Sequence, residues 1–144
     1  MIARLVTPAL YRGLSRLGTP AIHFWLARRR GHGKEDKARF PERLGHAALA
    51  RPPGRLAWAH AASIGESLAV LPLAERLRAE GLGVLITSGT VTSARVLQER
   101  LREGIMHQYV PVDRPAAVRR FLDHWRPDVA VWVESELWPN LVLA

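Results

Sequence analysis

The chain of 144 residues has no cysteine, which excludes disulfide bonds and thiolate metal ligands and is compatible with a reducing compartment. Its six histidines show neither HExxH nor another close spacing typical of metal ligands. GxGxxG and GxxxxGK(S/T) are also missing, so nothing supports a dinucleotide or a P-loop nucleotide. We therefore expect no metal and no cofactor.

Long apolar runs are missing from the front of the chain. Arg12 and Arg16 interrupt the apolar residues there well before the ~20 positions that a membrane-spanning helix needs. The same arginines stand where a cleaved signal peptide has an unbroken apolar stretch. A simple transmembrane helix and a signal peptide are both disfavoured.

Acidic residues are scarce at the same end. Up to Arg55 there are twelve basic and three acidic residues, a balance of +9, whereas the remaining nine basic and ten acidic residues give −1. This asymmetry is typical of proteins that bind nucleic acid or dock on anionic lipid head groups. Because no reading helix or aromatic-lined sheet face is recognisable, we expect no nucleic-acid partner.

Apolar residues in the front segment recur at spacings of three and four, with arginines on the opposite side. We interpret residues 1–30 as a membrane-associated amphipathic helix that Pro20 interrupts, with Phe24 and Trp25 beside a final arginine cluster. The alternative is a helix whose apolar stripe packs on its own or another domain. The stripe comprises Ile2, Leu5, Val6, Ala9, Leu10, Leu14 and Leu17.

Residues 31–55 are rich in glycine, proline and charge, which predicts a basic connecting segment and not a core element. Lys34, Lys37, Arg39 and Arg43 give this segment a phosphate-binding character. They either contact a phosphate or are simply solvated.

Residues 56–144 alternate between short apolar runs and helical patterns, which predicts an α/β fold with a Rossmann-like parallel sheet. If the strand order is 3-2-1-4, the ligand crevice lies at the carboxyl ends of the first and fourth strands. The predicted strands cover 56–61, 83–87, 107–110 and 128–133, and the predicted helices cover 67–80, 93–103 and 115–125.

Carboxylates follow both strands that flank this crevice. Gly65 lets a substrate approach the backbone, and the amides that open the next helix keep Glu66 ionised. Glu66 is then suited to act as a general base, or it only favours the helix dipole. Glu134 and Glu136 can bind sugar hydroxyls, orient a loop or be solvated.

Five hydroxyl side chains occur between residues 87 and 93, after the second predicted strand. Turn and capping chemistry explains such a run, with Thr90 or Thr92 as the cap. A contact to a sugar or phosphate is the other interpretation.

Several segments together resemble the bacterial 3-deoxy-D-manno-octulosonic acid (Kdo) transferases, from about Arg28 to the last residue. The most specific are the S-x-G-E-S turn at residues 63–67 and the ExELWPN string at residues 134–140. The other matching segments are RFPERLG at 39–45, HAASIGES at 60–67, TSGT at 87–90 with Ser93 and Arg95, and YVPVD at 109–113.

The resemblance implies the N-terminal half of a glycosyltransferase B fold in an inverting enzyme at the cytoplasmic face of the inner membrane. That enzyme moves Kdo from CMP-Kdo to a lipid A precursor in lipopolysaccharide biosynthesis. It implies Glu66 as general base and Glu134 as the residue that assists at the transition state. The expected acceptor-binding residues are Ser63, Gly65, Ser67, Thr90, Glu136, Lys34, Arg39 and Arg43.

The sequence ends just after the ExELWPN string, where the family continues into a second domain that holds most of the CMP-Kdo site. We therefore expect residues 56–144 to be an acceptor-binding domain and the 144 residues to lack transferase activity by themselves. Two alternatives stay open. One is half of another sugar or sugar-phosphate enzyme, and the other is a non-catalytic, membrane-associated module.

Overall fold

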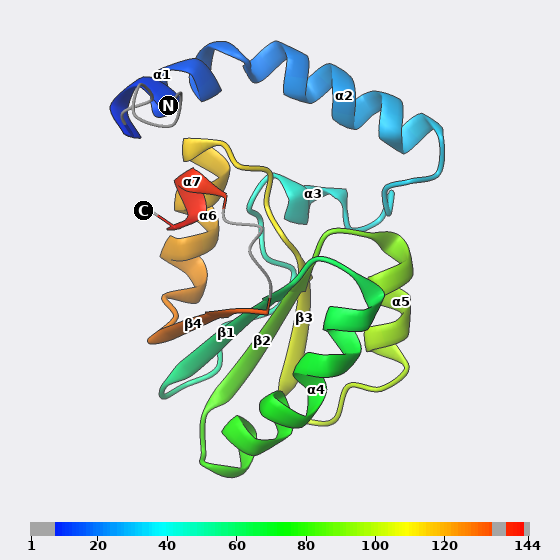
Figure 1. The fold of residues 1–144 in the computed structure, drawn as a ribbon, viewed down its shortest axis with the longest axis vertical. Coiled ribbons are helices and arrows are strands. Elements are labelled where there is room, and N and C mark those ends of the chain that lie inside the picture. Colours follow the sequence, from blue (N-terminus) through cyan, green and yellow to red (C-terminus); the bar gives the residue numbers. More distant parts are fainter. Residues whose placement is uncertain (1–7, 134–137, 143–144) are drawn as a thin grey trace, which may run out of the picture.

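The computed structural model describes residues 8–133 and 138–142. A four-stranded parallel sheet lies at its centre, with strand order β3-β2-β1-β4 (Figure 1). The predicted parallel sheet is confirmed, and its strand order is the 3-2-1-4 on which the expected position of the crevice depended. The strands are β1 (Leu56–Ala61), β2 (Gly83–Ser88), β3 (Ile105–Tyr109) and β4 (Val129–Trp132).

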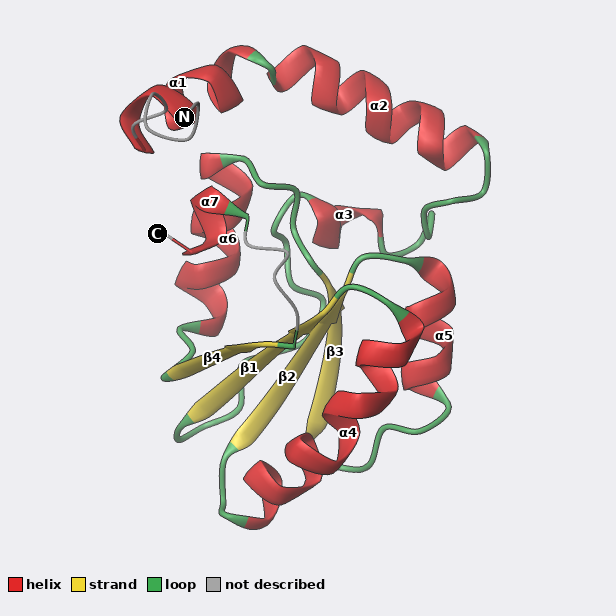
Figure 2. Ribbon diagram, in the orientation of Figure 1, coloured by secondary structure: helices red, strands yellow, loops and turns green. Residues whose placement is uncertain are grey.

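Helices cover both faces of the sheet, as Figure 2 shows. α4 (Ile64–Ala79) and α5 (Val91–Gln98) lie on one face, and α6 (Pro115–Trp125) lies on the other. Two clusters of buried apolar side chains correspond to the two faces because successive strand residues point to opposite sides. Trp58 packs with Phe121 and Trp125 in one cluster, and Ala59 packs with Val70 in the other.

The boundaries of α4 and α5 differ from the predicted ones, most clearly at the start of α4 and at the end of α5. α4 begins at Ile64, three residues earlier than expected, because the Ser63 side chain caps it. α5 ends at Gln98, five residues before the predicted end, and Leu97 accepts from the amides of both Arg100 and Leu101. The prediction for α6 was correct at both ends.

Two helices precede the sheet, α1 (Pro8–Leu17) and α2 (Thr19–Gly31). The predicted interruption lies at Gly18, and Pro20 falls in the first turn of α2, where a proline is tolerated. Leu26 is fully buried against Val112 and Ala117, so part of the front segment packs on the chain's own domain. Among the described residues, neither helix has the length and apolar character to cross a bilayer.

The apolar stripe of the front segment is only partly covered. Within the stripe, Leu10 and Leu14 are about half exposed and Leu17 is 80% exposed, whereas Ile2, Leu5 and Val6 lie outside the described residues. After the stripe, Phe24 is 72% exposed and Trp25 is 48% exposed. The front helices therefore expose apolar side chains on one side and pack on the domain through Leu26 on another.

The prediction that residues 31–55 stay outside the core was wrong. The short helix α3 (Phe40–Arg43) lies in this segment, and Glu35, Glu42 and Arg43 are buried. Gly45 has a φ of +86°, and a Cβ at this position would lie 2.1 Å from the carbonyl oxygen of Ala117 on α6. This close approach fixes the segment against α6.

A single carboxylate joins the front helices to the end of the described chain. Asp113, in the loop after β3, accepts from the Tyr11 hydroxyl at 2.8 Å and from the backbone amides of Asn140 and Leu141 at 3.2 and 3.0 Å. The two amides lie in the first turn of α7 (Pro139–Val142). Asp113 therefore caps α7 from a distant part of the chain and holds α1 against it.

Candidate functional site

The strand order reverses between β1 and β4, and their carboxyl ends lie side by side. His60 pairs with Trp132 in the sheet, and the amide of Val133 donates to the His60 carbonyl at 3.2 Å. The loop after β1 and the loop after β4 therefore leave the sheet at the same edge, where open α/β sheets bind ligands. Glu134 and Glu136 lie outside the described residues.

Glu66 lies in the first turn of α4 and forms a capping box with Ser63. Its amide donates to the Ser63 hydroxyl oxygen at 3.2 Å, and that hydroxyl donates to Glu66 Oε1 at 2.8 Å. Glu66 Oε2 accepts from the Ala62 amide at 2.6 Å. The expected location of Glu66 in the first turn of the helix is confirmed. Its carboxylate binds the amide of Ala62, which precedes the Ser63 cap, and not an amide of the helix itself.

The charge state of Glu66 follows from these contacts. Burial is the largest single influence and raises its pKa, but hydrogen bonds from Ser63 and Ala62 together outweigh burial, so the pKa lies below its usual value. The carboxylate is ionised at neutral pH, and it is partly exposed. Each oxygen keeps a lone pair beyond the capping contact, so the group can still accept a proton from a hydroxyl.

The small residues around Glu66 keep the approach open. Ser63 and Gly65 are exposed, and a Cβ on Gly65 would meet only the Ser63 hydroxyl, at 4.0 Å. Ser67, in contrast, is fully buried, and its hydroxyl donates to the Ser63 carbonyl at 2.8 Å. The structure thus brings Ser63, Gly65 and Glu66 to one surface and turns Ser67 inward.

A polar group that we did not predict as a site residue lies behind this turn. His60 is buried, and its Nδ1 lies 2.9 Å from the Thr87 hydroxyl, which also accepts from Trp58 Nε1 at 2.9 Å. Burial lowers the pKa of His60, and the opposing attraction of Glu66 is smaller, so His60 is neutral at pH 7. The signal was present in the sequence, since a histidine interrupts an apolar strand next to a carboxylate turn.

The hydroxyl-rich loop after β2 serves the fold in this structure. Thr90 caps α5, accepting from the Ser93 amide at 3.1 Å and donating to the Ser93 hydroxyl at 2.8 Å. Ser88 is buried and lies 2.9 Å from Nε2 of His107. Capping by Thr90 is confirmed, whereas a ligand contact by this residue stays a prediction.

The basic residues predicted to bind acceptor phosphate differ in their surroundings. Arg39 makes two contacts of 2.9 Å with Glu42 and stacks over Tyr109, with its guanidinium 4.9 Å from the ring centre. Arg43 is buried beside Glu35 at 3.3 Å and donates to the Val110 carbonyl. These two charges are thus matched inside the protein.

Burial also lowers the pKa of Arg43, with a smaller opposing effect from Glu35. Glu35 binds a second cation as well, because Arg29 Nε lies 2.7 Å from its Oε1. Lys34 is exposed and borders a surface hollow with Arg28 and His32. A phosphate contact by these basic residues stays a prediction, and Lys34 and Lys37 are the exposed ones among them.

An apolar cavity of about 490 Å³ lies between the front helices and the loop after β3. Tyr11, Leu14, Ile22 and Trp25 line it from the helix side. Within residues 8–133 and 138–142, no group of three or more His, Cys, Asp or Glu side chains is placed to hold a metal ion.

The parallel sheet with its front helices, and an ionised glutamate at the β1–α4 turn, define the class: an N-terminal half of the glycosyltransferase B fold. Residues 38–144 match the family described as 3-deoxy-D-manno-octulosonic-acid transferase (kdotransferase). The chain belongs to this family of Kdo transferases, in its N-terminal domain.

Curated relatives carry the same description. The chain is 42% identical over 137 residues to "Probable 3-deoxy-D-manno-octulosonic acid transferase, mitochondrial" of Arabidopsis thaliana, which covers 94% of the chain and 31% of the relative. It is 40% identical over 143 residues to 3-deoxy-D-manno-octulosonic acid transferase of Bordetella pertussis, covering 92% and 32%. The Rickettsia bellii enzyme of that name is 36% identical over 135 residues, covering 92% and 32%. The chain therefore spans about a third of the length of these relatives.

Proposed function

We propose that this chain is the acceptor-side part of an enzyme that transfers Kdo from CMP-Kdo to a lipid A precursor. The observation that supports this most is the position of Glu66. It is ionised, partly exposed, and located where the loops after β1 and β4 leave the sheet together. Membership of the Kdo transferase family supplies the donor and acceptor classes.

In the proposed reaction, the Glu66 carboxylate takes the proton of an acceptor hydroxyl. The hydroxyl oxygen forms a bond to the anomeric carbon of Kdo, and the bond from that carbon to the CMP phosphate oxygen breaks with inversion. The proton stays on Glu66 until solvent removes it, and CMP leaves with the electron pair. Base catalysis of this kind contributes roughly a hundredfold to ten-thousandfold. Glu134 is proposed to assist at the transition state.

The proposed acceptor site adds Ser63, Gly65 and Thr90 from the two loop turns, together with Lys34. The internal contacts of Arg39 and Arg43 support a second role for these residues, in holding the connecting segment on the sheet. We propose that the domain that binds CMP-Kdo lies in the part of such an enzyme that this chain does not span.

The test of Glu66 uses the chain joined to the remaining part of the Bordetella pertussis relative. In Glu66→Gln, the amide oxygen can accept from the Ala62 amide and the amide nitrogen can donate to the Ser63 hydroxyl oxygen, so the turn is kept while the base is removed. We expect the rate of Kdo transfer to fall at least a hundredfold while the unfolding midpoint changes little. Glu80→Gln, at the other end of α4 and exposed, is the matched control.

Near-normal transfer by Glu66→Gln would remove the base assignment and leave a capping role alone. That outcome would favour the alternative of a sugar or sugar-phosphate enzyme in which the carboxylate only shapes the turn. The alternative has a specific basis, since both oxygens of Glu66 already bind the protein.

We also propose that the front helices lie on the cytoplasmic face of the inner membrane. The support is the combination of exposed apolar side chains and arginines. Phe24 and Trp25 are 72% and 48% exposed, and the Arg29 guanidinium lies 4.7 Å from the Trp25 ring centre. The word "mitochondrial" in the name of the Arabidopsis thaliana relative concerns that protein's own compartment.

Replacing Phe24 and Leu17 with serine is expected to weaken binding to vesicles that contain anionic lipid by about tenfold or more, because each side chain withdraws apolar area from water. Leu49 and Val129, exposed to a lesser extent outside the front helices, provide the control pair. Equal binding by the two double variants would refute the proposed surface.

A further inference from the structure

A groove between α1 and the beginning of α6 collects basic side chains. Two adjoining cavities of about 260 and 150 Å³ share three lining residues, Arg16, Pro115 and Arg119. Arg114 and Thr19 complete one wall of the smaller cavity. Arg12 also borders the larger cavity, so arginines from two separate elements surround one groove.

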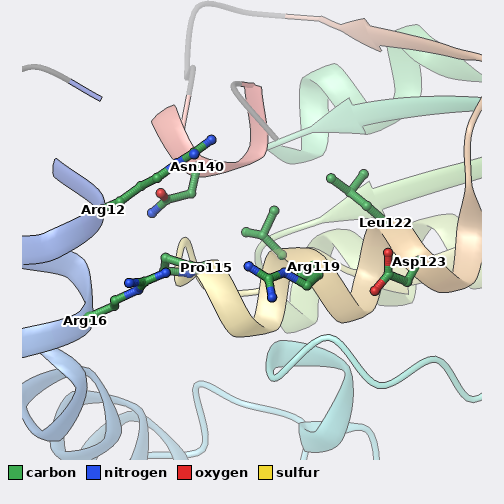
Figure 3. Close-up of a pocket in the computed structure, with 8 residues that line it drawn as sticks. Arg12, Arg16, Pro115, Arg119, Leu122, Asp123 and Asn140 are labelled. Carbon is green, nitrogen blue, oxygen red and sulfur yellow. The ribbon is translucent and has the colours of Figure 1, made fainter. Parts of the chain in front are cut away.

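Figure 3 shows the side chains that line the larger cavity. Arg16 extends from α1 toward Pro115, and Arg119 extends along α6 in the opposite direction, toward α1. No ion pair joins Arg16, Arg114 or Arg119 to a carboxylate within the described ranges 8–133 and 138–142. Three positive charges thus line one groove, and no carboxylate of the described residues forms an ion pair with them. They repel one another, and a bound anion would reduce this repulsion.

Within the part of the chain that the structure describes, one side-chain hydrogen bond orients one of these three arginines. Arg114 Nη1 donates to Nε2 of His23 on α2 at 2.8 Å. His23 must present a lone pair there, because a guanidinium has no acceptor. This contact directs the Arg114 guanidinium without neutralising it.

The beginning of α6 adds a second source of positive potential. Pro115 is its first residue, and Ala116, in the same turn, lines the smaller cavity. The first-turn amides of a helix have no partner inside the helix, and they attract anions together with the helix dipole. This contribution adds to the arginine cluster, which comes from side chains of two elements.

We propose that this groove, formed by Arg16, Arg114 and Arg119, is a binding site for a phosphate monoester. A guanidinium group can donate two parallel N–H hydrogen bonds to the oxygens of a phosphate. A phosphate monoester carries about two negative charges and a carboxylate carries one, so the monoester balances three arginines better. The smaller cavity, about 150 Å³, is below the range of pockets that enclose drug-sized ligands, so it fits a phosphate group with little more attached.

One carboxylate borders the larger cavity and makes the proposal more specific. Asp123 lies one turn beyond Arg119 on α6, and Figure 3 shows it at the far end of the groove from α1. Its negative charge opposes anion binding at that end. The phosphate is therefore assigned to the end formed by Arg16, Pro115 and Arg119, where the two cavities adjoin.

The assignment does not depend on the transfer reaction, and it is distinct from the turn that holds Glu66. α6 follows β3 and α4 follows β1, so both sites lie toward the carboxyl edge of the sheet but on helices that cover opposite faces. The phosphate has two possible sources, a lipid head group and a dissolved phosphorylated compound, and the two arms below distinguish them.

The first arm measures binding of glycerol 3-phosphate to the 144-residue chain by titration calorimetry at constant ionic strength. We expect saturable binding that falls at least about tenfold in Arg16→Gln/Arg119→Gln, since a hydrogen bond to a charged group is among the strongest in proteins. The control, Arg55→Gln/Arg100→Gln, removes the same charge from two exposed arginines outside the groove, and we expect a change of less than about twofold.

A variant that strengthens binding guards against loss of folding as an explanation. Asp123→Asn removes the opposing charge at the groove, so affinity for glycerol 3-phosphate is expected to rise about two- to threefold. Lack of saturable binding by the wild-type chain would overturn the proposal. Equal losses in the groove and control variants would overturn it as well, because they would indicate attraction by net charge alone.

The second arm identifies the source of the phosphate. Vesicles of phosphatidylcholine with phosphatidic acid present a monoester, and vesicles with phosphatidylglycerol at matched surface charge present a diester. A preference for phosphatidic acid that disappears in Arg16→Gln/Arg119→Gln supports the site with a lipid head group as ligand. Calorimetric binding that is lost in this variant, with unchanged vesicle binding, supports the site with a dissolved phosphate ester as ligand.

Discussion

Replacing Gly45 with alanine tests how firmly the connecting segment belongs to the core. Two costs act at this position. A φ of +86° places an alanine in the left-handed region, at roughly 1–2 kcal/mol, and its Cβ would stand 2.1 Å from the Ala117 oxygen. The nearest three atoms are all backbone atoms of α6, at 2.1, 2.9 and 3.1 Å, so no side chain can rotate away. Overpacking of this kind adds roughly 1–3 kcal/mol or more.

Gly54→Ala is the matched control for this prediction. Gly54 has a φ of +81°, nearly the same backbone conformation, but nothing lies within 4 Å of a Cβ there. Both substitutions also restrict the unfolded chain by the same amount, so that effect cancels in the comparison. The difference between the two variants therefore isolates the contact with α6.

Urea unfolding followed by tryptophan fluorescence measures this difference, because Trp58 and Trp125 are buried in the core beside α6. We expect Gly45→Ala to lower the free energy of unfolding by at least about 1–3 kcal/mol more than Gly54→Ala does. Equal costs for the two variants would refute the close packing of the segment on α6.

Two further predictions concern the caps and buried groups. Ser63→Ala removes the hydroxyl that both accepts from and donates to Glu66. We expect a loss of about 0.5–2 kcal/mol in stability and, in an NMR titration, a raised pKa of the Glu66 carboxyl. An unchanged pKa would contradict the hydrogen bonds between Ser63 and Glu66. Burial, with a smaller effect of Arg39, lowers the pKa of His107 from 6.5 to about 3. As the pH falls, the unfolded state therefore binds a proton at this histidine before the folded state does. Stability is expected to fall as the pH drops from about 6.5 toward 3. His107→Asn should flatten that decline in pH-dependent unfolding measurements, whereas the exposed His46→Asn should leave it unchanged.

The sheet was predictable because its strands carry their own signal. Leu56–Ala61 is almost wholly apolar in the sequence and wholly buried in the structure, as expected of a parallel strand with both faces covered. The S-x-x-E spacing of Ser63 and Glu66 is likewise a local signal for the start of a helix, although the predicted start at residue 67 missed it. Local patterns of this kind need no knowledge of the rest of the chain.

The roles of the basic segment were not predictable in the same way. Arg39, Arg43 and their neighbours have the composition of a solvated charge run, and composition does not reveal a partner that the fold brings near. Arg43 reaches the Val110 carbonyl across 67 residues, and Glu42 accepts from the Tyr109 amide across the same separation. Such contacts exist only after the sheet has formed, so the burial of these charges became visible only in the structure.

The pairing of His60 with Thr87 lies between these cases. The parallel register places the two residues side by side, so their contact follows once the first two strands are aligned. Neither residue has a local motif that predicts it. The polar group beneath the Glu66 turn therefore required the alignment of two strands, which periodicity alone does not give.

The hydrogen bonds of Asp113 connect α1 to the loop after β3 and to α7, so the front helices are an integral part of the domain. A displacement of α1 that breaks the Tyr11 contact changes the carboxylate that also holds the first turn of α7. Removing the front helices to simplify purification would therefore remove a contact that supports the first turn of α7. A truncated form that behaves differently has then lost this contact as well as any contact of the front helices with a membrane.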